Sequence, residues 1–128
     1  MPELVMIVDD SATIRQQVKS TLIDAGFEVA EAVDGADALA QIRASRTLSL
    51  VVCDVNMPNM NGIELLEKLR EDGGYTDLPV LMLTTEGLPE LIVRAKALGA
   101  RGWMVKPIQS EHLVRAVTKL MRKSGGAK

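Results

Sequence analysis

Short apolar runs of strand length alternate along this chain with stretches whose apolar residues recur every three or four positions. After the first run, Ile14, Val18, Leu22 and Ala25 follow at helical spacing, with polar residues between them. The strand-like runs lie at residues 5–8, 48–53, 80–83 and 103–105. This alternation predicts repeated βα units packed around a parallel sheet.

The remaining segments complete the same scheme. Residues 27–32 alternate apolar and polar side chains, which predicts a half-exposed strand near a sheet edge, whereas residues 48–53 are nearly all apolar, as in a strand covered on both faces. Ser110 is the expected N-cap of the last helix. The later helices are expected to bury Ala36, Leu39 and Ala40, then Leu65, Leu66 and Leu69, then Leu91, Ala95 and Leu98, and finally Leu113, Ala116, Val117 and Leu120.

Five such units account for nearly all of the 128 residues, so we expect one domain over residues 1–128, with a short flexible tail at 124–128 and no output domain. The net charge of −2 argues against a nucleic-acid partner, which requires a basic face. No apolar stretch reaches the ~20 residues of a membrane span, and the N-terminus lacks a signal-peptide profile. Cys53 is the only cysteine, which excludes a disulfide framework. These features predict a cytoplasmic domain.

Residues capable of chemistry follow four of the predicted strands. Because the carboxyl ends of parallel strands share one edge of a sheet, these residues are expected to meet there. Three carboxylates, a hydroxyl and an ammonium suit a divalent cation together with a phosphoryl group. The residues are Asp9 and Asp10, Asp54, Thr84 and Thr85, and Lys106 followed by Pro107.

Each motif also has a plainer interpretation. Asp9-Asp10-Ser11 has the composition of a helix N-cap, Thr84-Thr85 can satisfy the end of a strand, and Lys106 can be a solvated surface lysine. Cys53 is interpreted as a small core residue and His112 is assigned no catalytic role. The four motifs in this order and at these strand ends favour a metal and phosphoryl site.

The motifs Asp9-Asp10-Ser11, Asp54 through Gly62, Thr84 and Lys106-Pro107 make the chain resemble the response-regulator receivers over residues 3–123. Within that family it is most similar to the single-domain, CheY-like chemotaxis type. The resemblance implies an α/β, flavodoxin-like, three-layer (βα)5 fold with a central five-stranded parallel sheet in the strand order 2-1-3-4-5.

The resemblance also implies a chemistry. Asp54 would accept a phosphoryl group from a phosphohistidine on a CheA-like sensor histidine kinase. Mg²⁺, or Mn²⁺ in its place, would be bound by Asp10, Asp54, the main-chain carbonyl of Asn56 and waters held by Asp9. Carboxylates ~4 Å apart repel by about 4 kcal/mol at an effective dielectric of 20, so dependence on a metal is also a physical expectation.

Other positions take their roles from the same resemblance. Lys106 would neutralise the transferring oxygens, Thr84 would bond to the phosphoryl group, and Trp103 would swing inward as Thr84 moves. Asn56, Thr85 and Glu86 would tune how long the phosphoryl group lasts. The Lys106–Pro107 peptide bond would be cis, and the chain would assist its own phosphorylation and dephosphorylation without being an enzyme.

The implied partner surface comprises the fourth helix, fifth strand and fifth helix of a monomer, and the implied target is the flagellar motor switch. A phosphorelay intermediate that passes its phosphoryl group to a histidine phosphotransfer protein is an open alternative. A Mg²⁺-dependent, haloacid-dehalogenase-like phosphatase is a competing class, although its nucleophile lies in an Asp-x-Asp pair and the pair here is adjacent. A flavodoxin-like electron carrier would need a phosphate-binding loop after the first strand, which this sequence lacks.

Overall fold

The computed structural model describes residues 3–44, 48–57, 59–72, 77–85 and 89–125. Strands and helices alternate through these residues, as the hydrophobic pattern predicted. The elements are β1 (Leu4–Val8), α1 (Ala12–Asp24), β2 (Glu28–Ala32), α2 (Gly35–Ala44), β3 (Leu48–Asp54), α3 (Gly62–Asp72), β4 (Val80–Thr84), α4 (Pro89–Ala97), β5 (Gly102–Val105) and α5 (Ser110–Gly125).

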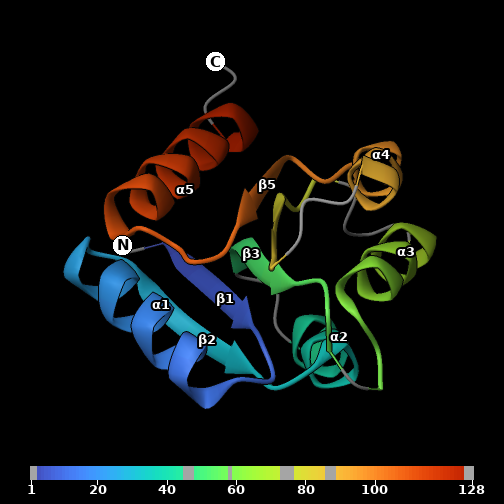
Figure 1. Ribbon diagram of the computed structural model, residues 1–128, viewed down its shortest axis with the longest axis horizontal. Coiled ribbons are helices and arrows are strands. Elements are labelled where there is room, and N and C mark those ends of the chain that lie inside the picture. The colour runs from blue at the N-terminus through green and yellow to red at the C-terminus, as the bar shows by residue number, and fades with distance from the viewer. Residues whose placement is uncertain (1–2, 45–47, 58, 73–76, 86–88, 126–128) are drawn as a thin grey trace.

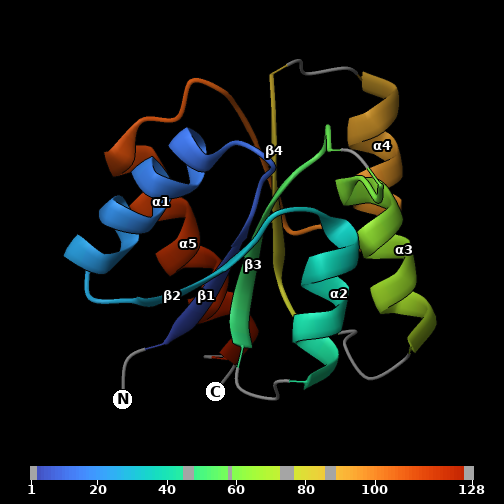
Figure 2. The same cartoon turned by 90° about the horizontal axis from the view of Figure 1, so that it is seen from below.

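The five strands form one parallel sheet in the order β2-β1-β3-β4-β5, which confirms the predicted topology. Figure 1 shows the sheet between two layers of helices, with α1 and α5 on one face and α2, α3 and α4 on the other. The turned view in Figure 2 shows the same three layers. Strand β2 lies at one edge, as its mixed polarity predicted.

Two hydrophobic clusters hold the layers together, one on each face of the sheet. In β1, Val5 and Ile7 pack toward α1 and α5, whereas Met6 and Val8 pack toward the other helices. Strand β3 alternates in the same way, so both central strands are apolar on both faces. Each fully buried aliphatic side chain contributes about 1.5–3 kcal/mol to folding, which makes this sheet a rigid support for the residues at its edge.

The structure corrects the predicted buried faces of two helices. In α2 the residues Ala36 and Ala40 are exposed, and the helix instead buries Leu39 together with Ala38 and Ile42. In the fourth helix Ala95 is buried, as expected, but the two leucines are only half-buried. The pattern was misjudged because small alanines occur on both sides of α2, so their spacing does not define the apolar face.

The ends of α5 also differ from the prediction. The helix begins at Ser110, so Ser110 is not its N-cap, and its hydroxyl instead lies 3.1 Å from the hydroxyl of Thr21 on α1. The helix continues to Gly125, two residues into the expected tail, and residues 126–128 lie outside the described part of the chain. Within the described residues, no helix is long and apolar enough to cross a membrane.

Candidate functional site

The polar strand ends meet at the carboxyl edge of the sheet, as predicted. Asp9 follows β1, Asp54 ends β3, Thr84 ends β4 and Lys106 follows β5. The strand registers bring these ends side by side, because Asp54 pairs with Leu83 and Thr84 pairs with Val105. Residues from distant parts of the sequence therefore form one site.

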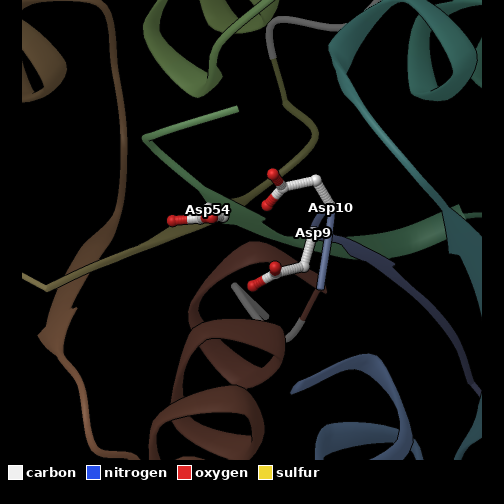
Figure 3. Close-up of side chains that lie close together, drawn as sticks. All are labelled: Asp9, Asp10 and Asp54. Carbon is white, nitrogen blue, oxygen red and sulfur yellow. The ribbon is translucent and has the colours of Figure 1, made fainter. Parts of the chain in front are cut away.

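Three carboxylates form the acidic part of this site. Asp9, Asp10 and Asp54 each place a carboxylate oxygen within 4.8 Å of the other two. Figure 3 shows Asp9 and Asp10 leaving the end of β1 beside Asp54. Asp9 is fully buried and Asp54 is 4% exposed, whereas Asp10 is exposed. Hard carboxylate oxygens with one open side are the ligands that Mg²⁺ binds, so this group fits a magnesium ion that keeps some of its waters.

Lys106 provides the nearby positive charge. Its Nζ lies 3.0 Å from Oδ2 of Asp9 and 3.4 Å from Oδ1 of Asp54, and its side chain is only 13% exposed. The main-chain N–H of Lys106 donates to the carbonyl of Thr84, which ties the end of β5 to β4. The Lys106–Pro107 peptide bond is cis, as the family resemblance implied. One ammonium group is thus shared between two buried carboxylates.

The surroundings of Asp54 disfavour its charged form. Burial raises the pKa of the Asp54 carboxyl, and the neighbouring Asp9 carboxylate raises it further. Lys106 and the main-chain N–H of Asn56, which donates to Oδ1 of Asp54 at 3.3 Å, oppose this effect without cancelling it. Lys106 and the Asn56 N–H therefore only partly offset the burial of the Asp54 carboxylate and its repulsion by Asp9.

The segment after β1 serves two purposes at once. Ser11 is the N-cap of α1, and its hydroxyl accepts a hydrogen bond from the main-chain N–H of Ile14 at 3.3 Å. The Ser11 N–H in turn donates to Oδ1 of Asp9 at 2.9 Å. The capping interpretation is therefore confirmed for Ser11, whereas Asp9 and Asp10 belong to the acidic group that fits a metal ion.

Sequence reasoning missed the residues that hold Asp9 in place, which are Arg15 directly and Glu31 through its contact with Arg15. Nη1 of Arg15 donates to the main-chain carbonyl of Asp9 at 2.7 Å, and Nε of Arg15 donates to Glu31 at 3.2 Å. Lys19 also pairs with Glu31, at 3.1 Å. Glu31 lies in β2, whose end was assigned no role in the site. The opposite charges of Arg15, Lys19 and Glu31 were the only sequence signal of these ion pairs, and charge alone does not show which residues lie close together.

Close packing under the site fixes the main chain at the end of β3. A Cβ added at Gly62 would lie 2.5 Å from the carbonyl oxygen of Asp54 and 2.9 Å from Cε of Met82. The N–H of Gly62 donates to the carbonyl of Val55 at 3.1 Å. Glycine is therefore required where α3 begins against the strand that carries Asp54.

The predicted switch and tuning residues take different positions. Thr84 is fully buried, Thr85 and Asn56 are exposed, and Glu86 lies outside the described residues. Trp103 is half-buried on β5, where it packs against the cluster below α2–α4. Its indole Nε1 is buried and has no hydrogen-bond partner in the described part of the chain.

Comparisons with known proteins agree with this geometry. Residues 5–118 match the family model described as the response regulator receiver domain. The chain is 39% identical to the chemotaxis protein CheY of Pseudomonas aeruginosa over 123 residues, which covers 95% of this chain and 98% of that protein.

Solved structures are also similar. The chemotaxis protein CheY4 of Vibrio cholerae matches with a TM-score of 0.88 and 44% identity, covering 94% of this chain and 99% of that one. A CheY of Borrelia burgdorferi, solved as a CheX–CheY–BeF3–Mg complex, matches with a TM-score of 0.86 and 27% identity, covering 94% of this chain and 90% of that one.

Proposed function

The chain belongs to the response regulator receiver family, and from that premise we propose that Asp54 accepts a phosphoryl group from a CheA-like sensor histidine kinase. One observation carries the proposal: the Asp54 carboxylate is buried at a strand end between two further carboxylates and the Lys106 ammonium. Receivers are signalling domains rather than conventional catalysts, and we propose that this one assists its own phosphorylation and dephosphorylation.

The transfer exchanges one bond for another. A carboxylate oxygen of Asp54 bonds to phosphorus while the bond between phosphorus and the histidine nitrogen breaks. The nitrogen keeps the electron pair and takes a proton from solvent, which leaves an acyl phosphate on Asp54 and a neutral histidine on the kinase. Lys106 stabilises the charge on the phosphoryl oxygens, since a fixed cation beside the transferring group lowers the barrier to transfer. Its 3.4 Å distance from Asp54 supports this role.

We further propose that Asp10, Asp54 and the main-chain carbonyl of Asn56 hold Mg²⁺, or Mn²⁺ in its place, with Asp9 holding coordinated waters. When bound, the ion supplies positive charge that offsets repulsion between the carboxylates and the incoming phosphoryl group. Asp9 is suited to an indirect role because Lys106 already occupies one of its oxygens, at 3.0 Å. Asn56, Thr85 and Glu86 would tune the lifetime of the acyl phosphate.

Thr84 and Trp103 would convert phosphorylation into a change of shape. Thr84 lies buried at the end of β4, and Trp103 lies on the neighbouring strand with an indole N–H that has no acceptor among the described residues. A hydroxyl drawn toward the phosphoryl group changes the packing behind it, and phosphorylation then shifts an existing equilibrium between two arrangements.

The output surface in this proposal comprises α4, β5 and α5. Val93 on α4 is 67% exposed and Val105 on β5 is 49% exposed, which gives this side apolar contacts for a protein partner. With chemotaxis proteins among its relatives, we propose the flagellar motor switch as the target and a cytoplasmic monomer as the acting form. A phosphorelay, in which Asp54 passes its phosphoryl group to a histidine phosphotransfer protein, is the second candidate.

Mass spectrometry of the intact protein tests the proposal directly. After incubation with Mg²⁺ and acetyl phosphate, the wild type should gain one phosphate that is lost on mild alkaline treatment, as an acyl phosphate is. Asp54→Asn should gain none, and Asp72→Asn, which removes a surface carboxylate paired with Arg43, should label like the wild type. Labelling retained in Asp54→Asn would disprove the assignment, and sustained turnover of a phosphate ester in bulk would favour a phosphatase.

The partner is tested with purified proteins. A motor-switch protein should bind more tightly to the beryllofluoride-treated, Mg²⁺-loaded receiver than to the untreated one. Beryllofluoride is a suitable mimic because the Borrelia burgdorferi relative was solved in a complex that contains it. Transfer of label to a histidine phosphotransfer protein, without any gain in motor-switch binding, would favour the phosphorelay.

A further inference from the structure

Two loops that are distant in sequence are fastened to each other beside the site. The turn between β2 and α2 contributes Asp34 and Gly35, and the loop between β3 and α3 contributes Asn59 and Met60. Nδ2 of Asn59 donates to Oδ2 of Asp34 at 2.8 Å, and the N–H of Gly35 donates to the carbonyl of Met60 at 3.0 Å. We refer to these two hydrogen bonds as the loop clasp.

Asp34 is a firm anchor for the clasp. Although charged, it is only 9% exposed, and its Oδ1 accepts the N–H of Asp37 in the first turn of α2 at 2.8 Å. Asp37 reciprocates by accepting the N–H of Val33 at 3.0 Å. These bonds form a reciprocal cap that fixes Asp34 to the helix. The hydrogen bonds from Asp37 and Asn59 lower the pKa of Asp34, which is therefore ionised as it holds Asn59.

Two features, one on each loop, allow the β3–α3 loop to lie close to this anchor. Asn59 has a φ of +67°, a left-handed conformation that asparagine tolerates better than most residues with a Cβ. A Cβ added at Gly35 would lie 2.5 Å from the carbonyl oxygen of Met60. The contact between the loops thus requires Gly35 and favours a residue such as Asn59 that tolerates the left-handed conformation.

The clasped loop is the one that leaves Asp54. Its first residues are held at β3, where Asn56 donates to Oδ1 of Asp54 and Val55 donates to the carbonyl of Leu83. Its last residues are held at α3, where Asn61 and Glu64 cap each other. Between these ends the clasp supplies the anchor from another part of the fold. The described part of this loop is therefore attached to β3, to α3 and, through the clasp, to Asp34.

We propose that Asp34 and Asn59 are positioning residues for metal binding, because they hold the loop that carries Asn56 next to Asp54. This inference rests on the proposed function, which places that carbonyl among the Mg²⁺ ligands. It also gives the end of β2 a role that its sequence does not indicate. Residues that orient the ligands of a metal typically affect its affinity by about 10–100-fold, and the clasp acts on one ligand from a distance, so we expect about tenfold.

Calorimetric titration with Mg²⁺ alone tests the clasp. Asn59→Ala and Asn59→Gly should both weaken Mg²⁺ binding by about tenfold, although glycine keeps the left-handed backbone accessible. Asn59→Asp should be the most damaging, because it places a second carboxylate against Asp34. Adding Asp34→Asn to Asn59→Asp restores an amide facing a carboxylate and should recover most of the lost affinity.

Asn61→Ala is the matched control on the same loop. It removes the Asn61 side chain that caps α3, in which Oδ1 of Asn61 accepts the N–H of Glu64 at 2.9 Å, and it leaves both hydrogen bonds of the clasp in place. It should lower the stability of the fold while leaving Mg²⁺ affinity within about twofold of wild type. Mg²⁺ binding by Asn59→Ala equal to wild type would overturn the proposal. So would an equal loss in Asn61→Ala, or a swapped double variant no better than Asn59→Asp. A wild type that binds Mg²⁺ but is never phosphorylated would contradict the proposed function. The role of the clasp in Mg²⁺ binding would still be decided by the titrations of the variants.

Discussion

Replacing Asp54 with asparagine should make the metal-free protein more stable, although it removes the residue that the site is built around. The ionised Asp54 carboxylate is held in a buried position against Asp9, and its raised pKa shows that the charged form is disfavoured in the folded protein. Asparagine has nearly the same shape, and its carbonyl oxygen can still accept the N–H of Asn56. The substitution therefore removes the charge and keeps the contact.

The size of the effect follows from the distances in the site. At an effective dielectric of 20, Lys106 at 3.4 Å attracts the Asp54 carboxylate by about 5 kcal/mol. Asp9, with an oxygen no more than 4.8 Å away, repels it by about 3.5 kcal/mol or more. Asp10 adds a smaller repulsion because it is exposed and screened. These charges nearly cancel, so the cost of burying an ionised carboxylate decides the sign, and we expect a gain of about 1–2 kcal/mol.

Denaturation in excess EDTA at neutral pH measures this gain. The midpoint of thermal unfolding should rise by about 3–5 °C for each kcal/mol in a chain of this length. Glu28→Gln, which removes a negative charge from an exposed position on β2, controls for the change in net charge. Mg²⁺ at about a hundred times its dissociation constant should stabilise the wild type by about 2.7 kcal/mol and Asp54→Asn by much less.

An Asp54→Asn protein that is less stable than wild type in EDTA would refute this reasoning. It would mean that the attraction of Lys106 outweighs both the burial of Asp54 and its repulsion by Asp9. A gain in stability by Glu28→Gln as large as that by Asp54→Asn would also refute it, because the effect would then reflect net charge rather than the site.

Four further predictions follow from the same contacts. The raised pKa of Asp54 contributes stability that is full below its ordinary value of 3.8 and is lost as the pH rises through the raised folded value. Urea unfolding of the metal-free wild type across mildly acidic pH should therefore show a loss with rising pH that Asp54→Asn lacks. Lys106→Met should slow phosphorylation by acetyl phosphate by about 10²–10³-fold, as measured by the rate of mass gain. Gly62→Ala should cost about 1–3 kcal/mol in urea unfolding, because its Cβ meets the carbonyl of Asp54. Beryllofluoride with Mg²⁺ should shift the fluorescence of Trp103, the only tryptophan, and Thr84→Ala should suppress the shift.

The fold could be predicted from the sequence because each buried strand is a continuous apolar run that can be recognised without knowledge of its neighbours. The apolar runs at residues 48–53 and 80–83 are long enough, and apolar enough, to be read as strands covered on both faces. Once those strands are parallel, the positions of Asp54 and Thr84 at a common edge follow from topology alone. Local pattern therefore placed the main residues of the site without any knowledge of their contacts.

The parts that could not be predicted depend on contacts between loops or on small residues. The buried face of α2 was misassigned because Ala36 and Ala40 differ little from buried Ala38 in side-chain size or polarity. The tie from Arg15 to Glu31 and the bond from Asn59 to Asp34 join residues 16 and 25 positions apart, with no periodicity to link them. Such contacts are set by how the elements pack, which the pattern of one segment does not contain.

The sharing of Lys106 between two carboxylates bears on how the proposed transfer would depend on a cation. The ammonium lies closer to Asp9, at 3.0 Å, than to Asp54, at 3.4 Å. Asp9 is fully buried, so releasing it from Lys106 would leave its carboxylate without an opposite charge, held only by the Ser11 N–H, which is strongly unfavourable. Lys106 therefore cannot turn wholly to a phosphoryl group unless Asp9 gains another partner. Asp10 and Asp54 have the same sign of charge as Asp9, and Arg15 is already bonded to the Asp9 carbonyl and to Glu31, so we expect the new partner to be a cation from solution. Removing divalent cations should therefore slow phosphorylation of Asp54 even though Lys106 is present.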